Sequence, residues 1–157
     1  MPSNKSKVVS SLHVPLVSIV IPTYKRPNSL REAVGDVLNQ TFTDWEIIIV
    51  DDNDPLSFYA IETEKLVNKF NQNIPIKYIQ HNKNRGACAA RNTGILAAQG
   101  KYIAFLDDDD TWVDIKLEKQ VSLLEKLSSR IGMVYCWMDY FDDQGNITHN
   151  HHPTLRG

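Results

Sequence analysis

Hydrophobic residues are arranged along this chain in two alternating patterns. Short, mostly apolar segments, typical of strands in the interior of a protein, occur at residues 17–21, 45–50, 76–79 and 102–106, with Ser18, Glu46 and Lys77 as the polar exceptions. The segments between them carry apolar residues at every third or fourth position, which is the spacing of one helix face. Strands and helices that alternate in this way form βαβ units with right-handed crossovers. The pattern therefore predicts an α/β fold with a mainly parallel sheet flanked by helices.

Local signals predict where several of these elements begin and end. Ser29 and Glu32 have the spacing of a capping box, which predicts the start of the first helix. A second helix is expected at about residues 56–70, and a third is expected to end before Gly100, which would be its C′ residue. After a fourth helix, the segment 133–141 predicts a last strand.

Length and composition limit the classes of protein to which the chain can belong. It has 157 residues, enough for one domain with a buried core, and we expect a disordered leader at 1–15 followed by a single domain at 16–157. Seventeen basic against nineteen acidic residues give a net charge of −2, which argues against nucleic acid as a partner. No apolar stretch approaches the ~20 residues of a membrane-spanning helix. Two cysteines fit a reducing compartment, so we expect a cytoplasmic protein.

Polar clusters follow three of the predicted strands. They lie at residues 22–26, 51–54 and 107–110, and the last is a run of four aspartates. Because parallel strands end at the same edge of a sheet, where α/β folds bind ligands, the three clusters are expected to surround one crevice. Four adjacent carboxylates repel one another unless a cation or a ligand rich in donors lies among them, and their oxygens suit Mg²⁺ or Mn²⁺. Arg85 and Gly86 add donors for an anion at the start of the third helix.

Six ordered sequence features together resemble the family 2 glycosyltransferases. They are Val-Ser-Ile-Val-Ile-Pro-Thr-Tyr at 17–24, Gln-Thr-Phe at 40–42, Glu-Ile-Ile-Ile-Val-Asp-Asp at 46–52, Asn-Arg-Gly-Ala-Cys-Ala-Ala-Arg-Asn-Thr-Gly at 84–94, Gly-Lys-Tyr-Ile-Ala-Phe-Leu-Asp-Asp-Asp-Asp at 100–110 and Trp112. The resemblance implies the GT-A fold, in which a Rossmann-like nucleotide-binding half is joined to an acceptor-binding half.

The resemblance also implies roles for individual residues. The divalent metal, Mn²⁺ or Mg²⁺, is expected on Asp109 first and on Asp107 second, within the family's Asp-X-Asp motif. Asp52 is expected to accept a hydrogen bond from the base. The residues expected to contact the nucleotide sugar are Pro22, Thr23, Tyr24, Arg26, Asp51, Asp52, Arg85, Gly86, Arg91, Asp107 and Asp108.

The activity implied by the resemblance is metal-dependent, inverting transfer of a hexose from a UDP-sugar. The acceptor would be a saccharide or a lipid-linked saccharide, as in polysaccharide biosynthesis in the cytoplasm or at the inner face of the membrane. The general base of this family lies well downstream of the Asp-X-Asp motif, so we expect it beyond Gly157. The chain is therefore expected to be a donor-binding half, truncated before the acceptor-binding half, with little or no activity by itself. Apolar surface left exposed by that truncation predicts a homo-oligomer.

Other functions fit parts of the same pattern. A non-catalytic nucleotide-sugar-binding module, or pseudoenzyme, has the same donor site without a base. Asp107 to Thr111 also fits the Asp-X-Asp-X-Thr motif of haloacid-dehalogenase-like phosphohydrolases, although that family carries it on the first strand. A nucleotidyltransferase would need a glycine-rich loop after the first strand, and residues 22–26 contain no glycine.

Overall fold

The computed structural model describes residues 13–72, 74, 76–127, 130–142 and 144–151, so that most of the expected leader lies outside the described residues. By their contacts the residues fall into two compact units, 1–114 and 115–157, and each is described by itself. The first unit contains all the motifs that the sequence analysis singled out.

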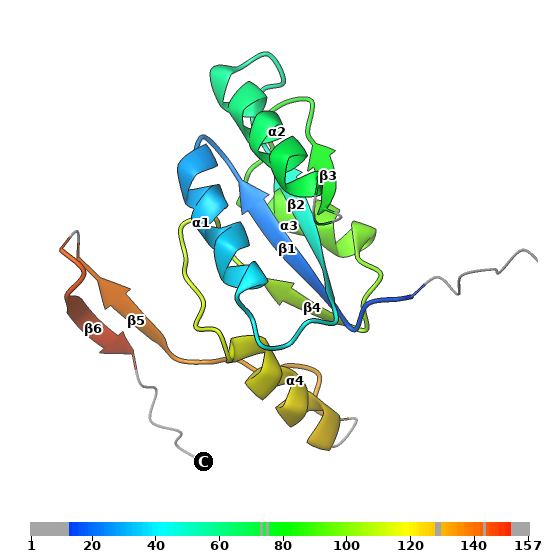
Figure 1. The fold of residues 1–157 in the computed structure, drawn as a ribbon, viewed down its shortest axis with the longest axis vertical. Coiled ribbons are helices and arrows are strands. Elements are labelled where there is room, and N and C mark those ends of the chain that lie inside the picture. Colours follow the sequence, from blue (N-terminus) through cyan, green and yellow to red (C-terminus); the bar gives the residue numbers. More distant parts are fainter. Residues whose placement is uncertain (1–12, 73, 75, 128–129, 143, 152–157) are drawn as a thin grey trace, which may run out of the picture. The chain divides into compact units, whose positions relative to one another are not determined.

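The first unit is built on a four-stranded parallel sheet. Its strands are β1 (Val17–Thr23), β2 (Trp45–Asp51), β3 (Ile76–Gln80) and β4 (Tyr102–Phe105), in the spatial order β3-β2-β1-β4 (Figure 1). All seven residues of β1 are buried, as a mostly apolar segment predicts for a central strand. The predicted α/β fold with a parallel sheet is confirmed.

The register of the sheet brings the polar clusters to one edge. Thr23, the last residue of β1, pairs with Asp51 at the end of β2. Phe105, which ends β4, pairs with Val20, so the aspartates that follow continue beside the last residues of β1. The order and register of the strands therefore place the ends of β1, β2 and β4 at the same carboxyl edge, as the sequence analysis expected.

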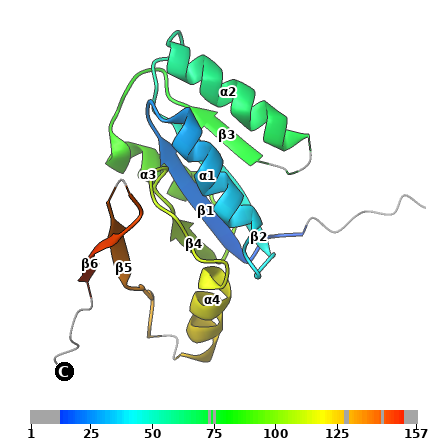
Figure 2. The same ribbon diagram turned by 60° about the vertical axis from the view of Figure 1, so that its left-hand side comes forward.

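Three helices cover the two faces of this sheet. Helices α1 (Pro27–Leu38) and α2 (Phe58–Asn71) lie side by side on one face, and α3 (Ala87–Ala97) lies on the other (Figures 1 and 2). Helix α3 packs closely on β1, because a Cβ atom at Gly94 would collide with the side chain of Val20. This close packing positions the start of α3 beside the ends of the strands.

Two predicted helix boundaries are wrong. Helix α1 begins at Pro27, two residues before Ser29, and its N-cap Arg26 makes no side-chain capping bond. Proline fits the first helical turn, because its φ angle is already helical and it lacks only an amide hydrogen that would be unpaired there. Helix α2 does have a capping serine, since the Ser57 hydroxyl accepts a hydrogen bond from the Ala60 amide at 3.1 Å.

Gly100 is not the C′ residue of the third helix. Helix α3 ends at Ala97, and its C-cap Ala98 already has extended backbone angles, φ −66° and ψ 141°. The absence of a side chain at Gly100 has a different cause. A Cβ atom there would lie 2.7 Å from the backbone nitrogen of Ser18, so only glycine permits this close approach to β1.

The second unit contains helix α4 (Lys116–Lys126) and an antiparallel hairpin of β5 (Met138–Phe141) and β6 (Ile147–His151). The predicted strand at 133–141 is wrong for its first five residues, because only 138–141 pair. Strand β6 was not expected, since its sequence Ile-Thr-His-Asn-His lacks an apolar run. None of the helices in the described ranges is long and apolar enough to cross a lipid bilayer.

Candidate nucleotide-sugar site

A cavity of about 500 Å³ lies at the carboxyl edge of the sheet. This is within the size range of small-molecule sites, about 300–1,000 Å³. The loop after β1, the ends of β2 and β4, and the start of α3 all contribute to its wall. The lining residues are Pro22, Thr23, Tyr24, Arg26, Asp52, Asn84, Gly86, Ala87, Ala90, Arg91, Asp107, Asp108 and Asp109.

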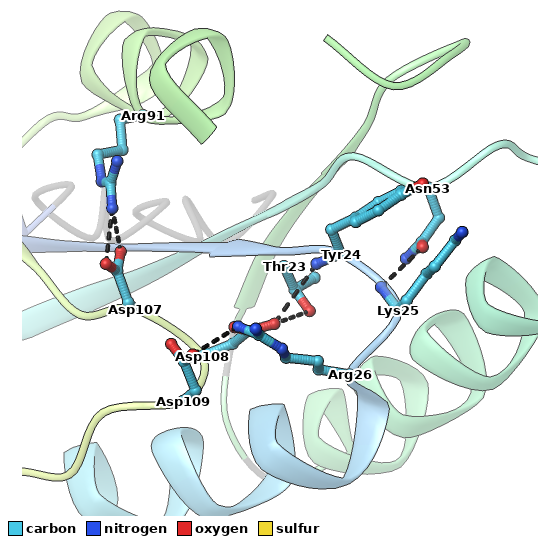
Figure 3. A network of polar contacts seen from close by, with 9 residues as sticks. All are labelled: Thr23, Tyr24, Lys25, Arg26, Asn53, Arg91, Asp107, Asp108 and Asp109. Carbon is cyan, nitrogen blue, oxygen red and sulfur yellow. Dashed lines mark hydrogen bonds and ion pairs between the residues drawn. The ribbon is translucent and has the colours of Figure 1, made fainter. Parts of the chain in front are cut away.

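Asp108 joins the acidic loop to the end of β1. Its Oδ2 accepts a hydrogen bond of 2.7 Å from the Thr23 hydroxyl and a longer one, 3.4 Å, from the Tyr24 amide (Figure 3). Burial raises the pKa of Asp108 above its ordinary value, and these bonds together with Arg26 oppose that rise. Asp108 is thus a wall residue whose carboxylate is held in place from two sides.

Arg26 lies across the acidic loop. Its Nη1 is 2.6 Å from Asp109 Oδ2 and 3.3 Å from Asp108 Oδ1 (Figure 3). The hydrogen bond to Asp108 and the charge of Asp109 raise the pKa of this guanidinium further above its already high value. Lys25, the residue before it, has a positive φ of 61°, and its amide donates to Asn53 Oδ1 at 2.9 Å. That contact fixes the turn from which Arg26 extends.

Arg91 reaches the acidic loop from the opposite side. It extends from α3, and its Nη2 lies 2.5 and 2.6 Å from the two carboxylate oxygens of Asp107 (Figure 3). Next in the run, Asp110 has a raised pKa, first because of burial and then because of the neighbouring charges of Asp107 and Asp109. Two guanidinium groups therefore neutralise part of an acidic cluster that the sequence alone marked as repulsive.

The acidic cluster fits a hard divalent cation in chemistry. Asp107, Asp108 and Asp109 all line the cavity, and carboxylate oxygens are the ligand type that Mg²⁺ and Mn²⁺ prefer. Within the described ranges no three potential ligands already stand in metal-binding geometry. Instead, arginine nitrogens hold the carboxylates of Asp107 and Asp109. A metal ion would therefore take over positions that positively charged side chains now occupy.

Asp52 connects β2 to the start of α3. Its Oδ1 accepts hydrogen bonds from His81 Nδ1 at 2.7 Å and from the Arg85 amide at 2.8 Å. Its Oδ2 accepts a 2.7 Å bond from the amide of Gly86. Gly86 has a φ of 87°, a backbone conformation that favours glycine, and it is the N-cap of α3. The carboxylate thus binds the two amides that immediately precede α3.

Two of the expected contact residues do not line the cavity. Asp51 is fully buried, and its carboxylate accepts hydrogen bonds from the Asn53 amide, the Asn53 side chain and the Tyr78 hydroxyl, the last at 2.6 Å. Burial and this bond raise the pKa of Tyr78. Arg85 contributes its backbone amide to Asp52, and its guanidinium lies 3.4 Å from His81 Nε2. The other ten expected residues, including both proposed metal ligands, are brought together around the cavity.

The Gln-Thr-Phe motif at 40–42 supports the loop that follows the aspartates. Gln40 donates from its side chain to the Val113 carbonyl at 2.9 Å, and the Thr41 amide donates to the Asp114 carbonyl at 2.9 Å. The amide of Trp112 donates to Asp36 Oδ2 at 2.8 Å. These contacts tie the segment after the acidic run to the end of α1, so the motif acts on the site indirectly.

Two residues at or near the site, His81 and Asn84, were missed by sequence reasoning. His81 is 5% exposed and lies directly after β3, at the same carboxyl edge as the other polar clusters. The segment Gln80-His-Asn82 was a signal of the same kind as those after β1, β2 and β4. Asn84, which lines the cavity and donates to the Asp52 carbonyl at 3.4 Å, was also not among the expected contacts.

Comparison with known proteins agrees with the geometry. The model of the family described as glycosyl transferase family 2 matches residues 18–156. An uncharacterized glycosyltransferase of Methanocaldococcus jannaschii is 36% identical over 93% of this chain and 49% of its own length. The Escherichia coli protein WfgD, named as a UDP-Glc:α-D-GlcNAc-diphosphoundecaprenol β-1,3-glucosyltransferase, is 36% identical over 76% of this chain and 44% of its own. The chain thus spans about half the length of the curated relatives it matches.

Solved structures share the fold. Staphylococcus aureus TarS (residues 1–349) in complex with UDP superimposes with a TM-score of 0.62 and 25% identity, over 70% of this chain and 32% of that one. A Pyrobaculum calidifontis mannosyltransferase in complex with GDP-Man and Mn²⁺ gives a TM-score of 0.60 at 20% identity, over 72% and 33% of the two chains. The expected GT-A fold is confirmed.

Proposed function

The chain belongs to glycosyl transferase family 2, and on that premise we propose that it binds a nucleoside diphosphate sugar in the cavity at the carboxyl edge of its sheet. The reaction is metal-dependent transfer of a hexose, with inversion, from a UDP-sugar to a saccharide or lipid-linked acceptor. One observation carries the proposal. The ends of three strands place Thr23, Asp52 and the acidic run 107–109 around a single cavity of about 500 Å³.

Uridine is proposed as the base because relatives use it. WfgD is named for UDP-Glc as donor, and TarS, at 25% identity, was crystallised with UDP. In this chain Asp52 would accept a hydrogen bond from the base, in the cavity that Tyr24 also lines. Arg26 and Arg91 would bind the diphosphate, because a guanidinium offers several donors in a plane that suits phosphate oxygens. Both arginines already line the cavity.

Asp109 and Asp107 are proposed to hold the divalent ion. Their carboxylates are now paired with Arg26 and Arg91, so binding of the ion with its diphosphate would exchange partners: carboxylates to metal, arginines to phosphate. When bound, such an ion stabilises the negative charge that develops on the departing diphosphate. Asp108 is better suited to hold the loop, since it is buried against Thr23.

Activation of the acceptor is proposed to depend on residues other than those described around the cavity. The four carboxylates among the lining residues, Asp52, Asp107, Asp108 and Asp109, each already accept hydrogen bonds from this chain's own donors. A general base needs a carboxylate that can take a proton from the acceptor hydroxyl. The described residues thus suit a donor-binding half, and we expect the 157-residue polypeptide alone to transfer sugar slowly or not at all.

Because all four carboxylates that line the cavity already accept hydrogen bonds, a second candidate function is also favoured: a nucleotide-sugar-binding module without catalysis. The two functions differ in one measurable property, namely whether an acceptor accelerates release of UDP from a UDP-sugar. Acceptor-dependent release at any rate above background supports the transferase, and its absence with intact donor binding supports the module. A phosphohydrolase is not supported, because Asp107 follows β4 and the chain belongs to a glycosyltransferase family.

The experiment that tests donor binding is calorimetry with UDP, GDP, CDP and ADP, each with and without Mn²⁺. We expect UDP to bind most tightly and to lose most of its affinity when Mn²⁺ is omitted. In Asp109→Ala the effect of Mn²⁺ should disappear. Asp44→Ala is the matched control, because Asp44 is an acidic residue preceding β2, outside the cavity lining. Equal binding of UDP by Asp109→Ala and by the unaltered chain, with the same Mn²⁺ dependence, would contradict the metal assignment.

Self-association and a position at the inner face of the membrane stay predictions. Apolar side chains such as Ile103 and Phe105 on β4 are 38% and 45% exposed in the first unit, which agrees with an unfilled surface there. Size-exclusion chromatography with light scattering tests the first of these predictions, and flotation with lipid vesicles tests the second.

A further inference from the structure

We propose that His81 positions the carboxylate of Asp52 for base recognition and so sets the preference for uracil over other bases. This inference rests on the proposed function, because it assigns the discrimination between bases to the same site. It concerns a residue outside the glycosyltransferase motifs, and its evidence is the set of contacts around one buried imidazole.

The imidazole of His81 is held on both sides. The His81 amide donates to the Asp51 carbonyl at 2.8 Å, which continues the pairing of β3 with β2. Nδ1 lies 2.7 Å from Asp52 Oδ1, and Nε2 lies 2.9 Å from Thr93 Oγ1 on α3. Because a carboxylate only accepts, Nδ1 must carry the hydrogen of the first of these bonds. The ring therefore spans the gap between the sheet and α3, and its donor fixes one oxygen of Asp52.

The contacts of Asp52 leave it little capacity for a ligand. A carboxylate has about four acceptor positions, two on each oxygen. Oδ1 uses both, for His81 and for the Arg85 amide, and Oδ2 uses one for the Gly86 amide. Among the described contacts, one acceptor position remains, on Oδ2. Asp52 lines the cavity, so this position is the one available to a bound base.

A single remaining acceptor matches uracil better than the other bases. The pairing edge of uracil has one N–H group between two carbonyl oxygens, which needs one acceptor and offers no second donor. Guanine presents two adjacent donors on that edge, so its second donor would be left unpaired in the site. Adenine and cytosine present an exocyclic amino group beside a ring nitrogen that accepts, and that nitrogen would face the carboxylate. Unpaired buried groups of this kind are what makes polar sites selective.

Removing the His81 donor would change this arrangement. Oδ1 of Asp52 would regain an acceptor position. The Asp52 carboxyl group would also lose one of the hydrogen bonds that fix its rotation about χ2, a torsion with a broad energy minimum. The site could then pair with a second donor, as guanine requires. Loss of the donor should therefore reduce the ratio of UDP affinity to GDP affinity. A general loosening of the fold would instead lower the affinity for both nucleotides by the same factor.

Two substitutions separate these effects. The side-chain amide of His81→Asn can donate from near the position of Nδ1 and keep the bond to Asp52. The longer side chain of His81→Gln reaches toward Thr93 instead and leaves Asp52 without this donor. Thr93→Val leaves the bond between Nδ1 and Asp52 in place and removes the Thr93 contact at Nε2, together with the bond from the Thr93 hydroxyl to the Ala89 carbonyl. It serves as a third variant if His81→Gln does not fold. Calorimetry of the full chain with UDP and with GDP, both in Mn²⁺, gives the two affinities for each variant.

We expect UDP affinity to fall about tenfold in His81→Gln, the size of losing one hydrogen bond to a charged group, while GDP affinity changes less than about twofold. His81→Asn should keep the UDP to GDP ratio of the unaltered chain, and Thr93→Val should lower it by a smaller factor than His81→Gln. An unchanged ratio in both His81→Gln and Thr93→Val would overturn the inference and leave the proposed function standing. If the unaltered chain binds no nucleoside diphosphate, the proposed function itself is wrong.

Discussion

The hydroxyl of Thr23 donates a 2.7 Å hydrogen bond to Oδ2 of Asp108, and this bond joins two residues 85 positions apart in the sequence. Thr23 ends β1, and Asp108 follows the neighbouring strand β4, so the bond closes the carboxyl edge of the sheet between them. Asp108 is one of the few buried charged residues in the part of the chain that the structure describes, and burial raises its pKa. The threonine therefore stabilises the charged form of a carboxylate at the centre of the acidic run.

Replacing Thr23 by valine tests this relationship. The side chain keeps its size but loses the donor, and a buried carboxylate then lacks one partner. We expect the free energy of unfolding to fall by about 1.5–3 kcal/mol, the range for a hydrogen bond to a charged group. Urea unfolding measures the loss. Thr23→Ser keeps a hydroxyl and should recover most of it, and equal stability of the serine and valine variants would argue against a role for this bond.

Arg26 is expected to compete with a metal ion for the acidic run. Its guanidinium lies 2.6 Å from Asp109 and 3.3 Å from Asp108, where a divalent cation would also be attracted. Arg26→Met should therefore bind Mn²⁺ alone several-fold more tightly, by roughly 1 kcal/mol for one unit charge at a partly exposed site. The same variant should bind UDP with Mn²⁺ less tightly, because a phosphate donor is gone.

The matched control for this experiment is Lys25→Met. It removes the same charge from the neighbouring residue, whose ammonium lies over the ring of Tyr24, 4.9 Å from the ring centroid. Titration of Mn²⁺ by electron paramagnetic resonance reports free ion directly in all three proteins. If Lys25→Met and Arg26→Met raise Mn²⁺ affinity equally, general charge and not the specific pairing with Asp109 is responsible.

Hydrophobic patterning predicted the fold and the edge at which the site lies. The four segments became the four strands of one parallel sheet, and the two central strands, β1 and β2, are buried as such apolar segments predict. The edge strand β4 is only half-buried, because no further strand covers its outer side in the described sheet. The polar residues that follow β1, β2 and β4 then had to share one edge, and ten of the twelve expected site residues line one cavity there. Asp51 does not, because it is the last paired residue of β2 and its side chain turns to Asn53 and Tyr78.

What sequence reasoning missed depends on contacts between distant residues. The pairing of Arg26 with Asp109 and of Arg91 with Asp107 joins residues 83 and 16 positions apart, and no local pattern encodes it. Gly100 looked like a helix C′ residue because it follows α3, yet its contact with Ser18 on β1 explains it better. Strand β6 is polar, so its pairing with β5 could not be read from hydrophobicity.

The turn between β5 and β6 should be sensitive to acid. Hydrogen bonds from the backbone and side chain of Asn146, and from the Gln144 amide, hold the pKa of Asp142 below its ordinary value. A carboxyl group with a lowered pKa stabilises the folded turn above its unfolded pKa of about 3.9. That contribution to stability is lost as the pH falls through the lower pKa that Asp142 has in the folded state.

Amide hydrogen exchange measured by NMR checks this expectation. Exchange at Gln144 and Asn146, corrected for the intrinsic effect of pH, should show less protection once the pH is below the pKa of Asp142. The variant Asp142→Ala removes the acceptor and should show weak protection at every pH. A turn whose protection is the same in acid and at neutral pH would mean that the Asp142 carboxylate does not hold it.

The close packing of α3 on β1 gives the most direct steric prediction. A Cβ atom at Gly94 would collide with both methyl groups of Val20, and Val20 is fully buried in the centre of the sheet. Gly94→Ala should therefore lower the free energy of unfolding by about 1–3 kcal/mol, the usual cost of overpacking a core.

Gly35→Ala in α1 is the control, because no atom lies within 4 Å of its added Cβ. It should raise stability by about 0.5–1 kcal/mol through helix propensity. In the double variant Val20→Ala with Gly94→Ala, the second substitution should cost much less than it does alone, because the colliding methyl groups are gone. Additive losses would place the origin of the Gly94 effect elsewhere than at Val20.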